Sequence, residues 1–311
     1  MQDSMQLAAV DIGSNAIRLQ IVRPIMEGNL VSFKKTEYIR FPLRLGDDVF
    51  KKGRISKNTA DRFLKLMTAF KLLIDLYDVK DHIAVATSAM REASNGMEIV
   101  AQVEEVSGLK IQIIEGGLEA EILSKAIIPV ISNGYFIHID VGGGSTELNL
   151  YNEKVRIASK SFNIGSVRKL SPEQKQKTFD EIKDWYAQAE VPAKTTVNAI
   201  GTGGNINKIY SLANIKGNNM MSIHEMEAIK AYISTYTLDQ RVSILMMNPD
   251  RADVVIPASE IYIKVMKIIG ATQMYVPGVG LKDGLVYNLY EKASQTSLSN
   301  VRFLDQLYME Y

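Results

Sequence analysis

One pattern of residues occurs twice in this chain and limits how it can fold. Residues 8–22 read AAVDIGSNAIRLQIV, and residues 136–150 read FIHIDVGGGSTELNL. Each stretch has an apolar run, an aspartate, a glycine turn with small polar residues, and a second apolar run. This order predicts a β-hairpin with a tight turn. Two such hairpins predict a duplicated domain, opened in each half by the same element.

The turn of each hairpin can hold an anion. Successive backbone N–H groups of small residues form a concave nest that closes on phosphate oxygens. In the second hairpin the nest residues are Gly142, Gly143, Gly144 and Ser145. In the first hairpin the corresponding candidates are Ser14, Asn15 and the nearby Arg18. A glycine turn also occurs in hairpins that bind nothing, and its repetition here favours the phosphate interpretation.

Acidic residues flank the second turn. Asp140 enters the turn and Glu147 leaves it, and two carboxylates beside a phosphate suit a bridging divalent cation. Aligning the hairpins places Asp11 on Asp140 and Arg18 on Glu147. The candidate metal ligands are therefore Asp140, Glu147 and Asp11.

Two α/β domains of ordinary size fit a chain of 311 residues. Pro129 and the Asn133-Gly134 turn mark a boundary, so we expect domains at residues 1–128 and residues 129–311. The C-terminal helix can join either the second domain or the first.

Bulk properties narrow the function classes. There is no cysteine, which excludes disulfides and thiolate sites, and the net charge of +1 argues against nucleic acid and other large polyanions as general partners. No apolar run reaches membrane-spanning length and no signal peptide is recognisable, so we expect a cytoplasmic protein without a membrane partner.

Polar loops follow three further predicted strands. Arg91 and Asn95 follow a strand at residues 82–86, Arg168 follows a strand at residues 155–162, and Gly203 follows a strand at residues 196–200. Strand ends of α/β sheets are where ligands bind, and a glycine loop before a helix admits phosphate. A surface loop with an Asn-Gly turn is the alternative for Arg91 and Asn95.

Three glutamates, Glu115, Glu119 and Glu121, lie in IEGGLEAEIL, after a strand predicted at residues 109–114. Glu119 and Glu121 are two positions apart and cannot share one helix face, so at most one can serve as a general base on water. Acidic residues in a first helical turn are also favoured by the helix dipole alone. Spacing does not choose between the two residues.

Helices are expected at several amphipathic stretches. Ser56 is a predicted N-cap of the first, Ser171 opens another that runs to about Ala189, and residues 253–269 should form a helix bent by Pro257.

The ordered set of loops resembles one family. DIGSNAIRL, RLGDDV, ATSAMREASNG, IEGGLEA, IDVGGGSTEL, NIGSVRKL, IGTGGN and GLKDG occur in the order found in the exopolyphosphatase and guanosine pentaphosphate phosphohydrolase (Ppx/GppA) family. That family belongs to the actin, sugar kinase and Hsp70 superfamily. The resemblance implies two ribonuclease-H-like domains with an interdomain cleft, and exopolyphosphatase chemistry with Mg²⁺, for which Mn²⁺ can substitute. A homodimer is a family-level expectation.

The resemblance implies catalytic and metal-binding roles for residues that the motifs above already single out. Glu119 resembles the catalytic base, and Asp140 and Glu147 resemble the carboxylates that position metal and water. The substrate would be polyphosphate or guanosine pentaphosphate, hydrolysed at a phosphoanhydride bond. The chain departs from the family at Leu118, where glutamate is frequent, and at Lys282, where arginine is usual. It also resembles the short form, without a C-terminal helical His-Asp domain.

Two other classes stay open at this stage. A kinase of the same superfamily would consume a nucleotide, and a non-catalytic regulator would bind polyphosphate or guanosine tetraphosphate without releasing phosphate.

Overall fold

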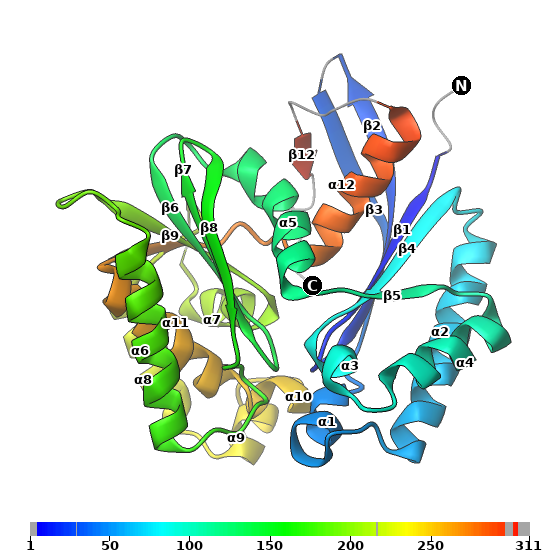
Figure 1. The fold of residues 1–311 in the computed structure, drawn as a ribbon, viewed down its shortest axis with the longest axis horizontal. Helices are drawn as coiled ribbons and strands as arrows, with labels where there is room; N and C mark the ends of the chain where they lie inside the picture. Colours follow the sequence, from blue (N-terminus) through cyan, green and yellow to red (C-terminus); the bar gives the residue numbers. More distant parts are fainter. Residues whose placement is uncertain (1–4, 29, 216, 296–300, 304–311) are drawn as a thin grey trace. The chain divides into compact units, whose positions relative to one another are not determined.

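The computed structural model describes residues 5–28, 30–215, 217–295 and 301–303 of the chain (Figure 1). The chain forms two compact units. Unit 1 comprises Met1–Val130 with Val279–Tyr311, and unit 2 comprises Ile131–Gly278. Each unit contains one six-stranded sheet with helices packed on it. The α/β class predicted from the sequence is confirmed.

The sheet of unit 1 has the strand order β12-β3-β2-β1-β4-β5. Strands β1, β2 and β3 form an antiparallel meander, and β1, β4 and β5 are parallel. The strands are β1 (Leu7–Ile12), β2 (Ile17–Glu27), β3 (Leu30–Phe41), β4 (Asp81–Ala86), β5 (Ile111–Ile113) and β12 (Val301–Phe303).

Helices cover both faces of this sheet (Figure 1). One apolar cluster joins α2 and α4 to one face of β1 and β2, and a second joins α5 and α12 to the other face. Alternate residues of β1 supply the two clusters, as the two-residue period of a strand requires: Val10 belongs to the first and Ala9 to the second. The helices of unit 1 are α1 (Leu45–Lys52), α2 (Lys57–Leu76), α3 (Ser88–Glu92), α4 (Gly96–Ser107), α5 (Gly116–Ile127), the 3₁₀ turn η1 (Ile128–Val130) and α12 (Leu281–Ser294).

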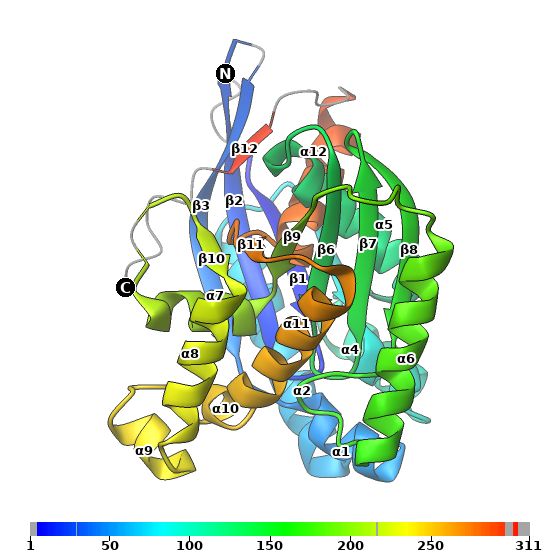
Figure 2. The ribbon, with the colours of Figure 1, turned by 90° about the vertical axis from the view of Figure 1, so that its left-hand side faces the viewer.

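The sheet of unit 2 has the order β10-β11-β9-β6-β7-β8. Its strands are β6 (Tyr135–Val141), β7 (Thr146–Asn152), β8 (Val155–Phe162), β9 (Val197–Thr202), β10 (Met220–Ser222) and β11 (Gln273–Tyr275). Its helices are α6 (Pro172–Gln188), α7 (Gly204–Ala213), α8 (Ile223–Ser234), α9 (Leu238–Ser243), α10 (Pro249–Ala252) and α11 (Val255–Ile269). Figure 2 shows α8 and α11 side by side, where their apolar faces share the core of this unit.

The two sheets repeat one topology. Read from the meander, β3-β2-β1-β4-β5 of unit 1 corresponds to β8-β7-β6-β9-β11 of unit 2. In each, the first strand of the unit pairs antiparallel with the next strand and parallel with the strand that returns after a helical crossover. The duplication inferred from the two hairpin motifs thus extends to five strands of each sheet, and the sixth strand is added at opposite edges, β12 beside β3 and β10 beside β11.

Two local predictions need correction. The helix predicted at residues 253–269 is confirmed as α11, but it begins at Val255, so Pro257 does not lie in the helix interior where it would cause a bend. Pro257 therefore lies in the first turn of α11, where a missing N–H leaves no hydrogen bond unmade. The strand predicted at residues 109–114 is shorter, spanning Ile111–Ile113.

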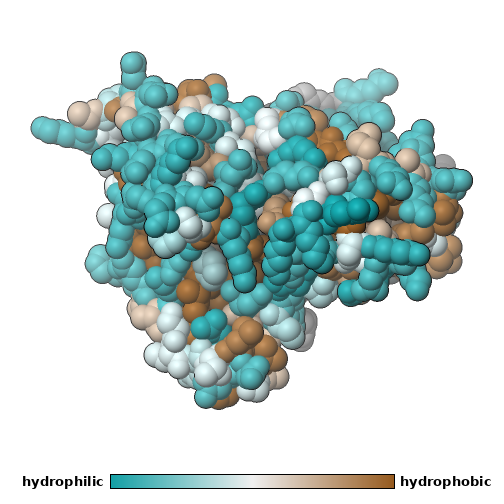
Figure 3. All heavy atoms as spheres, turned by 60° about the horizontal axis from the view of Figure 1, so that its bottom comes forward, coloured by the Kyte–Doolittle hydropathy of each residue, from teal (hydrophilic) through white to brown (hydrophobic). Residues whose placement is uncertain are grey.

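The surface is largely hydrophilic on the face drawn in Figure 3. Apolar side chains break this face in separate places, which is ordinary for a globular protein. Among the helices that the structure describes, none is both long enough and apolar enough to cross a bilayer.

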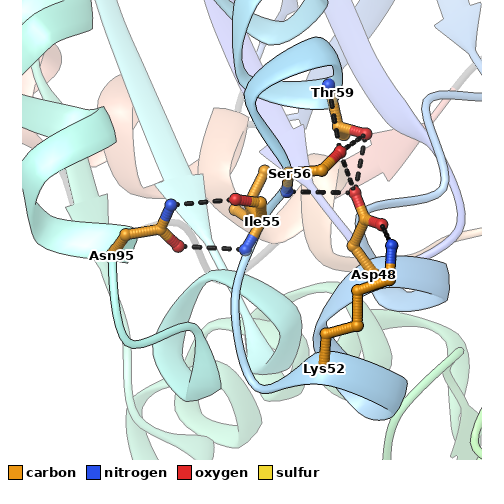
Figure 4. A network of polar contacts seen from close by, with 6 residues as sticks. All are labelled: Asp48, Lys52, Ile55, Ser56, Thr59 and Asn95. Carbon is orange, nitrogen blue, oxygen red and sulfur yellow. Dashed lines mark hydrogen bonds and ion pairs between the residues drawn. The ribbon is translucent and has the colours of Figure 1, made fainter.

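Polar contacts join α1, α2 and α4 (Figure 4). The carboxylate of Asp48 accepts hydrogen bonds from the Ser56 N–H at 3.1 Å, the Ser56 hydroxyl at 2.7 Å and the Thr59 hydroxyl at 2.7 Å. Burial raises the pKa of Asp48, but these bonds and the one from Lys52 outweigh it and hold the pKa well below its usual value. Ser56 is the N-cap of α2, as predicted, so Asp48 supports the start of that helix.

Replacing Asp48 by Asn should remove most of this support and cost about 1 kcal/mol of unfolding free energy at neutral pH. Because the folded pKa is depressed, the Asp48 contribution is present above the unfolded pKa of about 3.9 and is lost as pH falls toward the folded pKa. The Asp48→Asn variant should therefore lose less stability than wild type between about pH 5 and about pH 2, measured by urea unfolding. An equally steep acid loss in the variant would contradict this, and Asp47→Asn serves as the control.

Candidate functional site

The hairpin of unit 2 has the geometry that its sequence predicts. Strands β6 and β7 pair so that Asp140 lies directly opposite Glu147, and Val141 opposite Thr146. The turn between them closes with a hydrogen bond from the Gly142 N–H to the Ser145 carbonyl at 2.9 Å.

A second loop holds three successive carbonyl groups of this turn. The Gly142 carbonyl accepts from the Ser166 N–H at 3.0 Å, and the Gly143 carbonyl accepts from the Arg168 N–H at 3.0 Å. The Gly144 carbonyl accepts from Nε of Arg168 at 2.6 Å. These donors all belong to the NIGSVRKL loop that follows β8.

Fixing the carbonyls also fixes the direction of the N–H groups. In a trans peptide the C=O and the next N–H point in opposite directions, so the amides of Gly143, Gly144 and Ser145 point away from the supporting loop. In the described part of the chain none of these three amides donates a hydrogen bond to the protein. Three successive outward amides form the concave, electropositive arrangement that binds anions.

Gly165 explains how closely the two loops approach. A Cβ added to Gly165 would lie 2.5 Å from the Gly143 oxygen and 2.7 Å from the Gly144 carbonyl carbon. Only glycine permits this contact, because real side chains do not pack at such distances.

Negative charge gathers beside the turn. Asp140 Oδ1 lies 2.7 Å from the position that a Cβ on Gly203 would take, so Gly203 makes room for this carboxylate. Glu147 is 3% exposed, and its Oε1 accepts from the Ser161 hydroxyl at 3.0 Å. The sequence predicted Gly203 as a phosphate-approach glycine, and the structure places the Asp140 carboxylate next to it.

Tyr262 connects this region to α11. Its hydroxyl donates to the Thr202 carbonyl at 2.5 Å and accepts from the Val141 N–H at 3.2 Å. Burial, and then the charge of Asp140, raise the pKa of Tyr262 well above its usual value. Sequence reasoning missed Tyr262 because it lies in the middle of an apolar helix, with no motif around it.

Asp140 and Glu147 could coordinate a metal ion only if substrate phosphate and water supplied the remaining ligands. Among the described residues there is no group of three or more His, Cys, Asp or Glu side chains placed to hold a metal. Mg²⁺ typically binds one or two protein carboxylates and completes its shell with substrate phosphates and water. The opposed Asp140 and Glu147 fit that kind of site and do not fit an all-protein cage.

Buried polar groups continue along the same strands. His138 is fully buried, with Nε2 2.8 Å from the Thr202 hydroxyl and Nδ1 3.1 Å from the Asn149 amide. Burial lowers the pKa of His138 to about 3, so its imidazole is neutral near pH 7.

The hairpin of unit 1 repeats the construction with a different charge. Asp11 lies opposite Arg18 in register, and Arg18 Nη1 lies 2.6 Å from Asp11 Oδ2. The turn closes from the Gly13 N–H to the Ala16 carbonyl at 3.2 Å. Asp11 thus has its own counter-charge within the hairpin.

The start of helix α1 supports the first turn. The Ser14 carbonyl accepts from the Gly46 N–H at 2.8 Å, and the Asn15 carbonyl accepts from the Arg44 N–H at 3.1 Å. The Ser14 hydroxyl lies 2.9 Å from the Ser88 hydroxyl of α3.

Other predicted site residues of unit 1 have structural partners. Arg91 Nη1 donates to the Ile114 carbonyl at 2.6 Å, and its Nε lies 3.7 Å from Glu115. The Asn95 amide donates to the Ile55 carbonyl and accepts from the Ile55 N–H, both at 2.9 Å (Figure 4). Both ends of the Asn95 side chain are therefore engaged in joining α4 to the start of α2.

Glu119 and Glu121, which sequence spacing could not distinguish, differ in burial. Glu119 lies in the first turn of α5 and is 8% exposed, whereas Glu121 is exposed. Burial therefore favours Glu119 over Glu121 as the candidate general base.

The chain is similar to proteins of one phosphatase family. The model of the Ppx/GppA phosphatase family matches residues 27–293. A bifunctional 3-dehydroquinate synthase/phosphatase of Fusobacterium nucleatum is 28% identical over 85% of this chain and 43% of its own length. Exopolyphosphatase 1 of Mycobacterium leprae is 23% identical over 94% of this chain and 92% of its own length. Further relatives are named guanosine-5'-triphosphate,3'-diphosphate pyrophosphatase.

A solved structure has the same fold. The crystal structure of an exopolyphosphatase from Cytophaga hutchinsonii aligns with a TM-score of 0.77 and 21% identity, covering 94% of this chain and 99% of that one. The chain spans less than half of the Fusobacterium protein and nearly the full length of the Mycobacterium protein.

Replacing Gly165 by Ala should displace the turn at Gly143 and Gly144, because the added methyl group has no room there. Binding of inorganic tripolyphosphate, measured by calorimetry, should weaken by about tenfold or more. The matched control is Gly117→Ala, where an added Cβ meets nothing within 4 Å. Unchanged binding in a folded Gly165→Ala protein would show that the turn is not the anion site.

Proposed function

Because the chain belongs to the Ppx/GppA phosphatase family, we propose that it hydrolyses a phosphoanhydride bond. The substrate is a chain of inorganic polyphosphate or guanosine pentaphosphate, and the product released is orthophosphate. In this reaction the protein acts as an exopolyphosphatase, which transfers the terminal phosphoryl group to water.

The observation that carries this proposal is the supported turn of unit 2. Its three outward amides supply hydrogen-bond donors for phosphoryl oxygens, and Asp140 and Glu147 lie opposite each other next to it. Phosphoryl transfer depends mainly on positioning and on neutralising negative charge, which is what such donors provide. A hairpin without the Gly165 contact and the three held carbonyls would not keep these amides aligned.

We assign the remaining roles to individual residues. Gly143, Gly144 and Ser145 bind and orient the terminal phosphoryl group through their N–H groups. Glu119 accepts a proton from the attacking water, as a buried carboxylate can. Mg²⁺, when bound by Asp140 and Glu147, would supply charge neutralisation at the phosphate oxygens. Mn²⁺ has similar ligand preferences and can take the same place.

The first hairpin receives a supporting role. In the hairpin of unit 1, Ser14, Asn15 and Arg18 form an additional anion-binding turn, built like the turn of unit 2. The Arg18 contact neutralises Asp11, so the proposal places the metal with Asp140 and Glu147 and not with Asp11.

Relatives favour polyphosphate as the first substrate to test. The Mycobacterium exopolyphosphatase matches this chain over almost its entire length, whereas the chain covers 59% of one guanosine-5'-triphosphate,3'-diphosphate pyrophosphatase. The cytoplasmic location, the interdomain cleft and the homodimer expected from the sequence stay predictions.

Glu119→Gln should bind tripolyphosphate as wild type does and lose orthophosphate release by about 100-fold or more, because glutamine cannot accept the water proton. Release should be measured in Mg²⁺ with long polyphosphate, tripolyphosphate and guanosine pentaphosphate separately. Glu121→Gln, at an exposed position of the same helix, should keep wild-type turnover. Wild-type turnover in Glu119→Gln would reassign the base, and binding without release by wild type would make the protein a regulator.

Removing one of the two metal carboxylates should change the metal requirement. Asp140→Asn and Glu147→Gln should each raise the Mg²⁺ concentration needed for half-maximal activity by about tenfold or more. Asp11→Asn should leave that concentration nearly unchanged, although it breaks the ion pair with Arg18. A larger shift for Asp11→Asn than for the other two would place the metal on the first hairpin.

A further inference from the structure

Arg251 lies against the backbone where α7 begins. A Cβ added to Gly204 would be 2.1 Å from Nη2 and 2.4 Å from Nη1 of Arg251, so only glycine leaves room for the guanidinium. The start of a helix carries partial positive charge, which makes it an unfavourable neighbour for a cation.

A chain of hydrogen bonds leads from Arg251 to the candidate phosphate turn. Arg251 Nη1 donates to Asn205 Oδ1 at 3.3 Å, and Asn205 Nδ2 donates to the Ser166 hydroxyl at 3.2 Å. The Ser166 hydroxyl donates in turn to the Gly142 carbonyl at 3.2 Å. Asn205 and Ser166 are 6% and 7% exposed, so water competes little for these bonds.

The guanidinium sets the direction of the whole chain of bonds. Arginine has donors and no acceptor, so the Asn205 side chain must turn its oxygen toward Arg251 and its NH₂ toward Ser166. The Ser166 hydroxyl then accepts from Asn205 and directs its own hydrogen to the Gly142 carbonyl. With a neutral residue at position 251, the Asn205 amide could turn over and Ser166 could donate to it instead.

The last bond acts on the first peptide of the turn. The Gly142 carbonyl and the Gly143 N–H belong to the same peptide plane and point in opposite directions. Holding the carbonyl toward Ser166 therefore aims the Gly143 N–H at the position assigned to phosphate. The Ser166 N–H holds the same carbonyl at 3.0 Å, so the hydroxyl adds a second, direction-dependent restraint.

We propose that Arg251 is a positioning residue for phosphate binding, acting through Asn205 and Ser166 on the Gly142–Gly143 peptide. The inference rests on the proposed function, since it concerns the same turn. It predicts that Arg251 influences how tightly a polyphosphate end is held without touching it. The glycine pair in GTGGN then has two distinct tasks: Gly203 accommodates Asp140 and Gly204 accommodates Arg251.

The test compares two single variants with their combination. Arg251→Met removes the guanidinium, and Ser166→Ala removes the last hydroxyl without changing charge. Each should raise the KM for tripolyphosphate, and the Kd measured by calorimetry, by about tenfold, with kcat changed by less than about twofold. The double variant should have a Kd no higher than that of the single variant that binds tripolyphosphate less tightly, because the two substitutions break the same chain of hydrogen bonds.

Arg241 provides a matched control. This arginine of unit 2 donates to the backbone carbonyls of Ile233 and Ala252 at 3.2 and 3.0 Å, and neither bond belongs to the chain that leads through Asn205. Arg241→Met should lower Tm at least as much as Arg251→Met and leave KM and Kd unchanged. Equal KM effects of the two substitutions would overturn the inference by making it a general loss of packing.

The outcomes separate the two proposals. If wild type binds tripolyphosphate without releasing orthophosphate, the hydrolase function fails, and the Kd values of the variants still decide the role of Arg251. If the fold-increase in Kd of the double variant equals the product of the two single fold-increases, the inference is overturned, because Arg251 and Ser166 would then contribute independently. Wild-type Kd and KM in a folded Arg251→Met protein would overturn it as well, and wild type that binds no tripolyphosphate would end both proposals.

Discussion

The arrangement on which the account depends is the outward orientation of three successive backbone amides, imposed from behind by bonds to their carbonyl partners. Gly142, Gly143 and Gly144 each have a carbonyl held by the NIGSVRKL loop. Because peptide groups are planar, holding one end of each group fixes the other. The protein thereby has a preorganised set of donors and does not need to order a flexible glycine turn when a ligand arrives. Much of the neighbouring sequence serves this arrangement, including Gly165, whose missing side chain lets the two loops touch.

The two copies of the hairpin carry different charges at one matching position. Both copies share the pairing register, the turn-closing hydrogen bond and a supporting segment. At the matching cross-strand position unit 1 has Arg18 facing Asp11, and unit 2 has Glu147 facing Asp140. An aspartate paired with arginine is neutralised and presents a donor to an anion, whereas two facing carboxylates favour a cation. The two copies of the hairpin thus differ in charge at one matching strand position, Arg18 in unit 1 and Glu147 in unit 2.

The sequence predicted the features that depend on local pattern. The two hairpins and the duplicated α/β organisation follow from apolar alternation and glycine turns, and the Ser56 cap of α2 follows from its position before an amphipathic stretch. Features that depend on distant contacts could not be predicted in this way. Arg251 and Tyr262 come from helices far along the chain, and no spacing links them to the turn. Pro257 was misread because a proline in a first turn and a proline at a kink look alike in sequence. Glu119 and Glu121 were separated only by burial, which depends on packing of the whole of α5.

The most direct test is to follow the backbone amide resonances of Gly143, Gly144 and Ser145 by NMR in the Glu119→Gln variant, which should bind without hydrolysis, while inorganic tripolyphosphate is added in the presence of Mg²⁺. Amide protons that become donors to phosphate shift downfield, and the account predicts that these three show the largest downfield shifts in unit 2, saturating together. Resonances that stay in place while shifts concentrate at other glycine or lysine residues would contradict it, because the anion would then be bound somewhere else.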